Sequence, residues 1–410
     1  MFKRLLILTI ILSSLGFFNF SFLGKDVLKL IEIAGIGLII LIIVLQGIYG
    51  INEGFKLTFK WEVTLILISV VTSMFMAYSA HNQGLPTTLI AQRFMYFYFF
   101  YFALHLIKIP DYDLEKIIVY LAIIYTVFYI IQYIAYPRLI FNVRIAEDRG
   151  TVRIFQAGLL FLILAYFYIL NKSFGEFTPG RLALLLFFFS TIILMGTRQL
   201  IFSMLFLSML NILYSNKVKS KILVALIAVV AAVPVFFMFQ DIFLSILSLS
   251  KEQSVSIEEN GRILSGTYFL TEFFPNYAAY ITGNGADSAN SAYGSMIQMY
   301  KEVFGFYQSD VGIIGDFSKF GAIFLIAVIS VLVRVLYGKL GDELVYIKYF
   351  YLFIILTSFT GSGPFGDANS IVTICITFYI IDVYRHNQLV DESESPSDEM
   401  ETDTLNESTT

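Results

Sequence analysis

Long apolar runs separated by short polar segments recur along nearly the whole chain. Each run holds about 17–23 residues, close to the roughly 20 that an α-helix needs to cross the hydrocarbon core of a bilayer. The pattern predicts about twelve spans, at 5–22, 29–49, 62–79, 88–107, 116–136, 154–170, 181–196, 199–214, 221–239, 312–336, 344–360 and 368–384. We therefore expect an all-α fold, a polytopic bundle of transmembrane helices in a lipid bilayer.

One hydrophilic interval interrupts this pattern, from Gln240 to Asp310. It is long enough to fold into a small structure of its own. The stretches from Gly261 to Phe274 and from Ala292 to Tyr307 predict short helices that lie on the membrane surface. Pro275 ends the first, and Gly283-Asn284-Gly285 predicts a turn rather than a phosphate loop.

The chain is thereby divided into four regions. They are residues 1–239, with nine spans and an outer loop at 137–153, residues 240–311, a long extracytoplasmic loop, residues 312–384, with three spans, and residues 385–410, an acidic tail expected to be disordered. The first apolar run, Leu5–Phe20, lacks a convincing small-residue cleavage site, so we expect it to be retained as a helix and not removed as a signal peptide.

Composition excludes a soluble fold and several kinds of site. Hydrophobic residues make up 58% of the chain, charged residues 14%, and the mean hydropathy is +0.77. Soluble domains hold roughly 45–50% apolar and 25% charged residues. The single cysteine, Cys375, allows no intrachain disulfide, and three histidines far apart predict no zinc site. We expect no cofactor, and no stretch resembles a nucleic-acid surface.

Lysine and arginine predict the orientation. If the N-terminus is cytoplasmic, the inner segments hold more of these residues than the outer ones, so both termini are expected inside and the long loop outside. Arginines crowd one outer loop, at Arg138, Arg144, Arg149 and Arg153. A guanidinium group binds phosphate or carboxylate through two parallel hydrogen bonds, which favours an anion site here. The alternative is that Glu147 and Asp148 pair with some of them.

Two more arginines occupy unusual places. Arg93 lies inside the fourth span, where an ionisable residue faces a partner or a wet cavity, or else extends to the outer headgroups. Arg198 lies in Gly196-Thr197-Arg198-Gln199, a tight outer hairpin, where an interfacial cap is the alternative to a binding role.

The order of these features resembles a known family over roughly residues 135 to 340. The features are Arg149-Gly150-Thr151-Val152-Arg153 with Gln156-Ala157-Gly158, then Gly196-Thr197-Arg198, Gly261-Arg262, Gly283-Asn284-Gly285, Ser309-Asp310-Val311-Gly312-Ile313-Ile314-Gly315 and Phe320-Gly321. This set resembles the O-antigen polymerase (Wzy-type) and O-antigen ligase superfamily of bacterial envelope polysaccharide assembly.

The resemblance implies a glycosyltransferase of the bacterial inner membrane. Such an enzyme moves a glycan from an undecaprenyl-diphosphate carrier to a hydroxyl group, of a lipid-linked repeat unit in polymerases or of lipid A-core in ligases. The ligases carry a histidine in the long loop, and residues 240–311 hold none, which favours a polymerase. Expected partners are the lipid-linked oligosaccharide, a chain-length regulator and a flippase of the same pathway.

The chemistry predicts which side chains would act. A diphosphate leaving group carries roughly two negative charges and needs cations placed against it. The candidates are Arg153, Arg198, Arg262, Arg149 and Arg93. For the base that accepts the hydroxyl proton we favour Asp310 and Glu272, whose alternatives are a helix N-cap and a surface charge.

Two other functions fit less well. A lipid-linked oligosaccharide flippase would place charge near the bilayer midplane, and this chain keeps its charge in the loops. A non-catalytic partner in polysaccharide export would have less use for clustered outer arginines.

Overall fold

The computed structural model describes residues 2–49, 56–146, 152–217, 261–358, 363–367 and 369–394. Helices dominate these ranges. The α-helices are α1 (Phe2–Ser14), α2 (Lys25–Tyr49), α3 (Lys60–His81), α4 (Leu85–Ala91), α5 (Phe99–Ile107), α6 (Asp111–Ala135), α7 (Leu159–Gly175), α8 (Pro179–Leu194), α9 (Arg198–Tyr214), α12 (Gly261–Thr271), α13 (Tyr277–Thr282), α14 (Ala292–Phe304), α15 (Ile313–Tyr337), α16 (Val345–Thr357) and α17 (Ile371–Glu394). Short 3-10 turns are η1 (Gly16–Asn19), η2 (Arg93–Tyr98), η3 (Gln308–Asp310) and η4 (Pro364–Gly366), and the strands are β1 (Arg144–Ala146) and β2 (Arg153–Phe155).

Within the described ranges, 4 helices are long and apolar enough to cross a membrane. They are Asp26–Gln46 within α2, α3, α6 and α15. Other apolar helical segments are only 10–17 residues long, namely Arg93–Ile107, α7, α8, α9 and α16. The chain is thus a helical membrane protein, but the expected count of about twelve spans is not confirmed. The ninth expected span, 221–239, lies outside the described residues.

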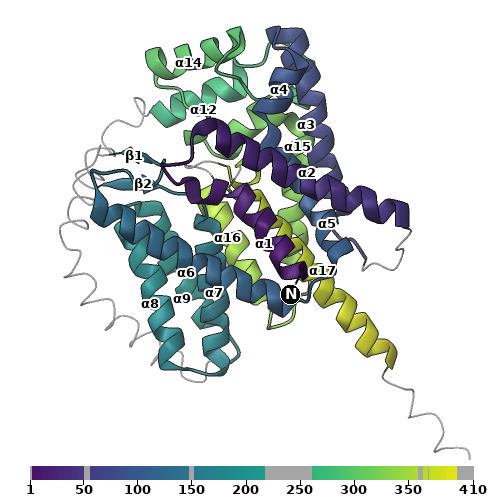
Figure 1. Cartoon of the computed structure of the whole chain (residues 1–410), viewed down its shortest axis with the longest axis vertical. Coiled ribbons are helices and arrows are strands. Elements are labelled where there is room, and N and C mark those ends of the chain that lie inside the picture. Colours follow the sequence, from purple (N-terminus) through teal and green to yellow (C-terminus); the bar gives the residue numbers. More distant parts are fainter. Residues whose placement is uncertain are drawn as a thin grey trace, which may run out of the picture.

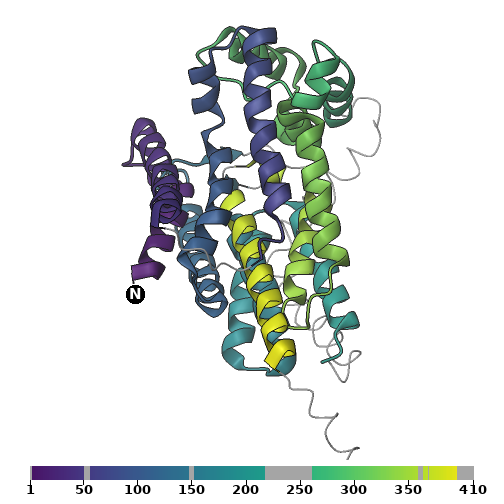
Figure 2. The ribbon, with the colours of Figure 1, turned by 90° about the vertical axis from the view of Figure 1, so that its right-hand side faces the viewer.

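The helices form two groups joined by α16 and α17. In one group α6, α7, α8 and α9 pack together, and in the other α15 runs along α3 (Figures 1 and 2). α16 contacts α7, α9 and α15, whereas α17 contacts α5 and α6. The short helices α12, α13 and α14 cap one end of α3 and α15, and α17 ends at the opposite end of the molecule (Figure 2).

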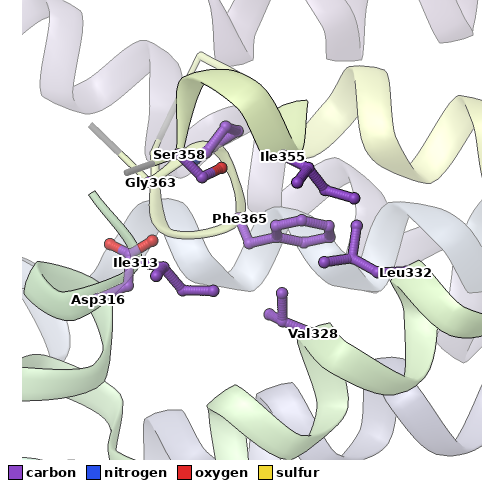
Figure 3. A pocket seen from close by; sticks show the side chains of 9 residues that line it. Ile313, Asp316, Val328, Leu332, Ile355, Ser358, Gly363 and Phe365 are labelled. Carbon is purple, nitrogen blue, oxygen red and sulfur yellow. The ribbon is translucent and has the colours of Figure 1, made fainter. Parts of the chain in front are cut away.

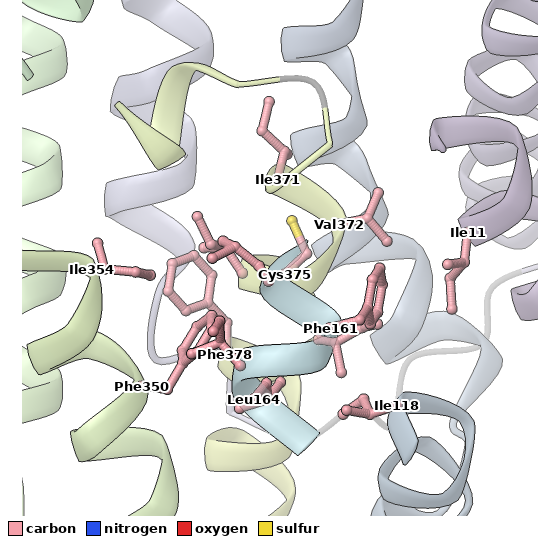
Figure 4. Close-up of a cluster of buried hydrophobic side chains, with 14 of the residues drawn as sticks. Ile11, Ile118, Phe161, Leu164, Phe350, Ile354, Ile371, Val372, Cys375 and Phe378 are labelled. Carbon is pink, nitrogen blue, oxygen red and sulfur yellow. The ribbon is translucent and has the colours of Figure 1, made fainter. Parts of the chain in front are cut away.

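α17 is the central helix of the core. Side chains from Ile371 to Ile381 are buried on every face, Thr373 and Thr377 among them. Figure 4 shows Cys375 and Phe378 enclosed by side chains of α1, α6, α7 and α16. Because its neighbours cover it on all sides, this helix needs no single apolar stripe. It remains helical to Glu394, in contrast to the disorder expected from residue 385, and Gln388 donates to the Tyr384 hydroxyl one turn back at 2.8 Å.

Two expected spans begin differently from the prediction. The fourth, 88–107, is divided into α4, η2 and α5, and the amide of Gln92 at the division donates to the Val70 carbonyl at 2.8 Å. The sixth, expected from 154, begins at Leu159 because β1 and β2 pair as an antiparallel hairpin. Ile145 lies opposite Ile154, which is buried, so the alternating pattern of this loop packs one face inward.

Candidate functional site

The chain between α13 and α14 crosses α15 and contacts it near Gly321. α15 breaks at Gly321, whose φ of 74° and ψ of −171° are not helical. The carbonyls of Ser318 and Lys319 accept hydrogen bonds from the backbone N–H groups of Asn284 and Gly285, at 3.1 and 2.8 Å. Backbone that leaves the helix at membrane depth needs such partners, because lipid supplies none.

Glycine is required on both sides of this crossing. A Cβ at Gly283 would collide with the Lys319 carbonyl, and one at Gly321 would collide with the Ile281 carbonyl. Both glycines also have positive φ, a conformation that other residues rarely adopt. The predicted turn at Gly283-Asn284-Gly285 therefore supplies hydrogen-bond donors to carbonyls at the break in α15, a role that its sequence alone did not indicate.

The C-terminal end of α3 holds residues 284–288 in place through hydrogen bonds. The side-chain amide of Gln83 donates to the Ala286 carbonyl at 2.8 Å and accepts from the Ser288 N–H at 3.0 Å. His81 contacts the amide oxygen of Asn284 at 3.1 Å. These contacts anchor the chain between α13 and α14, and hence the position of α12–α14, to a candidate membrane span.

The break sets the first two turns of α15 apart, and they carry a buried carboxyl group. Asp316 is only 5% exposed, and its Oδ2 has no hydrogen-bond partner in the structure. It forms part of the wall of a cavity of about 50 Å³, together with Ser358, Phe365 and other mostly apolar side chains of α15 and α16 (Figure 3). The cavity is large enough for a few groups of the size of water.

A glycine-containing loop wraps around Asp316. A Cβ at Gly363 or at Gly366 would collide with the Asp316 carboxyl group, so only glycine allows this close approach. The hydroxyl of Tyr98 donates to the Phe365 carbonyl at 2.8 Å and holds the loop against η2. This loop was not among the predicted sites, although its glycines and its acidic end lie between two apolar runs of the sequence.

Charges near Asp316 oppose one another. Lys319 attracts the carboxylate, and Asp367 lies close enough to repel it. Asp367 accepts a hydrogen bond from the Ser370 hydroxyl at 2.7 Å. Burial raises the pKa of Asp367 above its ordinary value, and the Ser370 hydrogen bond partly opposes that rise.

Arg198 is the first residue of α9, and contacts of its neighbour Gln199 place this end of α9 near the start of α15. The amide of its neighbour Gln199 donates to the Leu356 carbonyl at 2.6 Å, at the end of α16. Two residues later the Ser358 carbonyl accepts from the N–H of Ile313, at 3.0 Å, at the start of α15. The N-termini of α9 and α15 and the C-terminus of α16 therefore meet, and Asp316 lies one turn into α15.

Arg262 and Asp310 belong to two other elements that contact α15, namely α12 and η3. Arg262 is exposed in the first turn of α12, four residues before Gly266, which packs against Val311 and Ile314. Asp310, in η3, is half-buried and accepts from the Ser309 hydroxyl at 3.2 Å. It is not the N-cap of α15, because Gly312 takes that position without a side-chain cap.

The remaining predicted residues are more distant or paired. Glu272 is exposed after the end of α12. Arg93 forms an ion pair with Glu32 of α2, at 2.6 Å, which answers the question of its partner. Arg153 lies in β2 beside the ring of Phe155, on a strand that packs against α6. Arg149 lies outside the described residues.

The described ranges hold no group of three or more His, Cys, Asp or Glu side chains arranged to bind a metal ion. The candidate site comprises Asp316 and its cavity, and the elements that carry Arg198, Arg262 and Asp310 adjoin the first turns of α15 or the end of α16. Comparisons of the chain with protein-family models, with curated proteins and with solved structures found no match.

Proposed function

We propose that this chain is a glycosyltransferase that polymerises a bacterial surface polysaccharide such as O-antigen or capsule. It transfers the growing glycan from undecaprenyl diphosphate to a lipid-linked repeat unit. The proposal includes about twelve crossings of the inner membrane, both termini in the cytoplasm, and α12–α14 on the outer surface.

One observation supports the proposal above the others, namely the convergence at the first turns of α15. Arg198 and Arg262 come from elements far apart in sequence, and both elements adjoin the N-terminal part of α15. Gln199, next to Arg198, bonds to the end of α16, whose Ser358 bonds to the start of α15, and Gly266, one turn after Arg262, packs against Ile314. Arg198 is also the first residue of α9, so a cationic side chain occurs at the N-terminus of a helix, where the N–H groups lack partners within the helix. Both attract anions, which suits a diphosphate that gains charge as it leaves.

The reaction is tested in purified protein reconstituted into liposomes with undecaprenyl-diphosphate repeat units, without added metal or nucleotide. We expect a ladder of products spaced by one repeat unit. Absence of a ladder, with intact protein and the correct repeat unit, would contradict the polymerase and favour the ligase or flippase alternatives. A flippase is then distinguished in cells lacking the gene, where repeat units accumulate facing the cytoplasm.

Arginine variants test the site. Replacing Arg198 by Ala should lower the rate of ladder formation by about 10²–10³-fold, the typical cost of removing one group that stabilises developing charge. Arg262→Ala should also shorten the chains, and chains of normal length distribution would remove Arg262 from the site. Arg181→Ala is the matched control, since Arg181 bonds to Glu176 in the hairpin between α7 and α8.

A further inference from the structure

Asp316 is costly where it lies. A buried polar atom without a hydrogen-bond partner destabilises a protein, and more so when it is charged. The Oδ2 of Asp316 has no partner and Asp367 adds repulsion, while Lys319 and the backbone N–H of Gly366 offset part of this cost. A side chain kept at such a cost suggests a function other than stability.

A cavity that could bind part of a substrate lies beside Asp316. Ser358 and Asp316 provide its polar end, and Val328, Leu332 and Phe365 its apolar end (Figure 3). A hydroxyl group fits in about 50 Å³ beside the carboxyl group, in a cavity whose walls are mostly apolar. A carboxylate that is buried gains more from accepting a proton than one in solvent.

We propose that Asp316 is the catalytic base of the transfer reaction, with the acceptor hydroxyl bound at the polar end of this cavity. This assignment rests on the proposed function, and it makes Asp316 the proton acceptor in place of Asp310 and Glu272. The acceptor oxygen forms a bond to the anomeric carbon as its proton passes to Oδ2 of Asp316. The bond from that carbon to the diphosphate oxygen breaks, and the diphosphate leaves with the electron pair toward Arg198.

The surroundings of the three acids favour this assignment. Glu272 is exposed and Asp310 is half-buried, so water competes for both carboxyl groups. Asp316 is shielded, and it is linked to Arg198 through Ile313, Ser358 and the end of α16. A base and a leaving-group cation on adjoining helix termini can act on the two ends of one reacting bond.

The first test is Asp316→Asn, which keeps the shape of the side chain but cannot take up the proton. We expect turnover in liposomes to fall by about 10²–10⁴-fold, the usual contribution of a general base. The melting temperature should stay level or rise, because a buried charge is removed. Asp342→Asn, in an exposed loop, is the control and should change neither quantity.

The second test is chemical rescue, which a merely structural residue would not show. Asp316→Ala should be inactive, and added formate, a carboxylate small enough for the enlarged cavity, should restore turnover in proportion to its concentration. Formate should not rescue Arg198→Ala.

The outcomes separate the two proposals. If the wild-type protein forms a ladder and Asp316→Asn forms it equally fast, Asp316 is not the base and the polymerase remains. If Asp310→Asn or Glu272→Gln abolishes turnover and formate fails at position 316, the proton goes to the other acid. If the wild-type protein forms no ladder, the proposed function fails, whatever the variants do.

Discussion

Most buried acidic side chains in the described ranges have a basic partner or a hydrogen-bond donor, and Asp382 is the clearest case. Its carboxyl group accepts from the Tyr101 hydroxyl at 2.6 Å and from the backbone N–H of Thr58 at 3.2 Å, and it contacts Nε2 of His105 at 3.1 Å. This cluster ties the segment before α3 to α5 and α17. A lone acidic residue near the end of an apolar run gave no sign of these partners, because they come from three separate parts of the chain.

We predict that Asp382→Ala strongly destabilises the protein. Loss of the carboxyl group removes the acceptor of the Tyr101 hydroxyl and of the Thr58 N–H, and also the contact with His105, and each buried donor left without a partner costs about 1–3 kcal/mol. The melting temperature in detergent measures the change. Tyr101→Phe removes one donor to the carboxylate and the acceptor of the Phe59 N–H, but leaves the other contacts of Asp382 in place. It should cost less, and an equal cost for both variants would mean that the cluster does not act as described.

Arg93 shows what sequence could foresee at the level of a residue. Its depth inside an apolar run indicated a partner or a path to the headgroups. The partner is Glu32, which lies in a different expected span. Periodicity cannot show which two helices touch, so the pairing itself was not predictable.

Among the elements, the surface helices were the most predictable and the breaks the least. α12 and α14 begin at Gly261 and Ala292, where their patterns predicted, and end within a few residues of the expected limits. Asp310, in contrast, was wrong as a helix cap, because α15 starts two residues later than a cap at Asp310 would require. The expected span at 312–336 contains Gly312, Gly315 and Gly321, and nothing in its pattern shows that the helix breaks at Gly321.

The glycine crossing gives the prediction at this scale. Gly321→Ala should lower the melting temperature markedly, since a backbone with positive φ and extended ψ costs about 1–3 kcal/mol for a residue with a Cβ, and the collision with the Ile281 carbonyl adds to it. Gly283→Ala should act in the same direction. Gly37→Ala, in α2 with nothing within 4 Å of the added carbon, is the matched control and should be neutral or slightly stabilising.

If Gly321→Ala has the same melting temperature as the wild-type protein, the break in α15 is not required for folding. The ladder assay on the same variant then shows whether the break matters for the position of Asp316.

For the whole molecule, the orientation of the chain is a testable expectation. Cys375 is the one cysteine of the chain. A variant without it carries no cysteine, so a new cysteine can be placed at one chosen position and labelled there. We predict that Met299→Cys, on the exposed face of α14, reacts in intact cells with a maleimide that does not cross membranes. Lys217→Cys, after α9, should react only after the cells are opened. The reverse pattern would invert the topology and place the candidate site in the cytoplasm.

The sequence by itself determined that this is a helical membrane protein with a polar interval near residues 240–310, because the length of an apolar run and the placement of charge are local properties. It also pointed to Arg198 and Arg262 as unusual cations. Only the tertiary structure decided that the helices that carry these two arginines in their first turns adjoin α15 and the end of α16, that Gly283 and Gly321 fit against each other, and that Asp316 is enclosed by Gly363 and Gly366. These facts depend on contacts between segments distant in the chain, and such contacts follow from packing rather than from any local pattern.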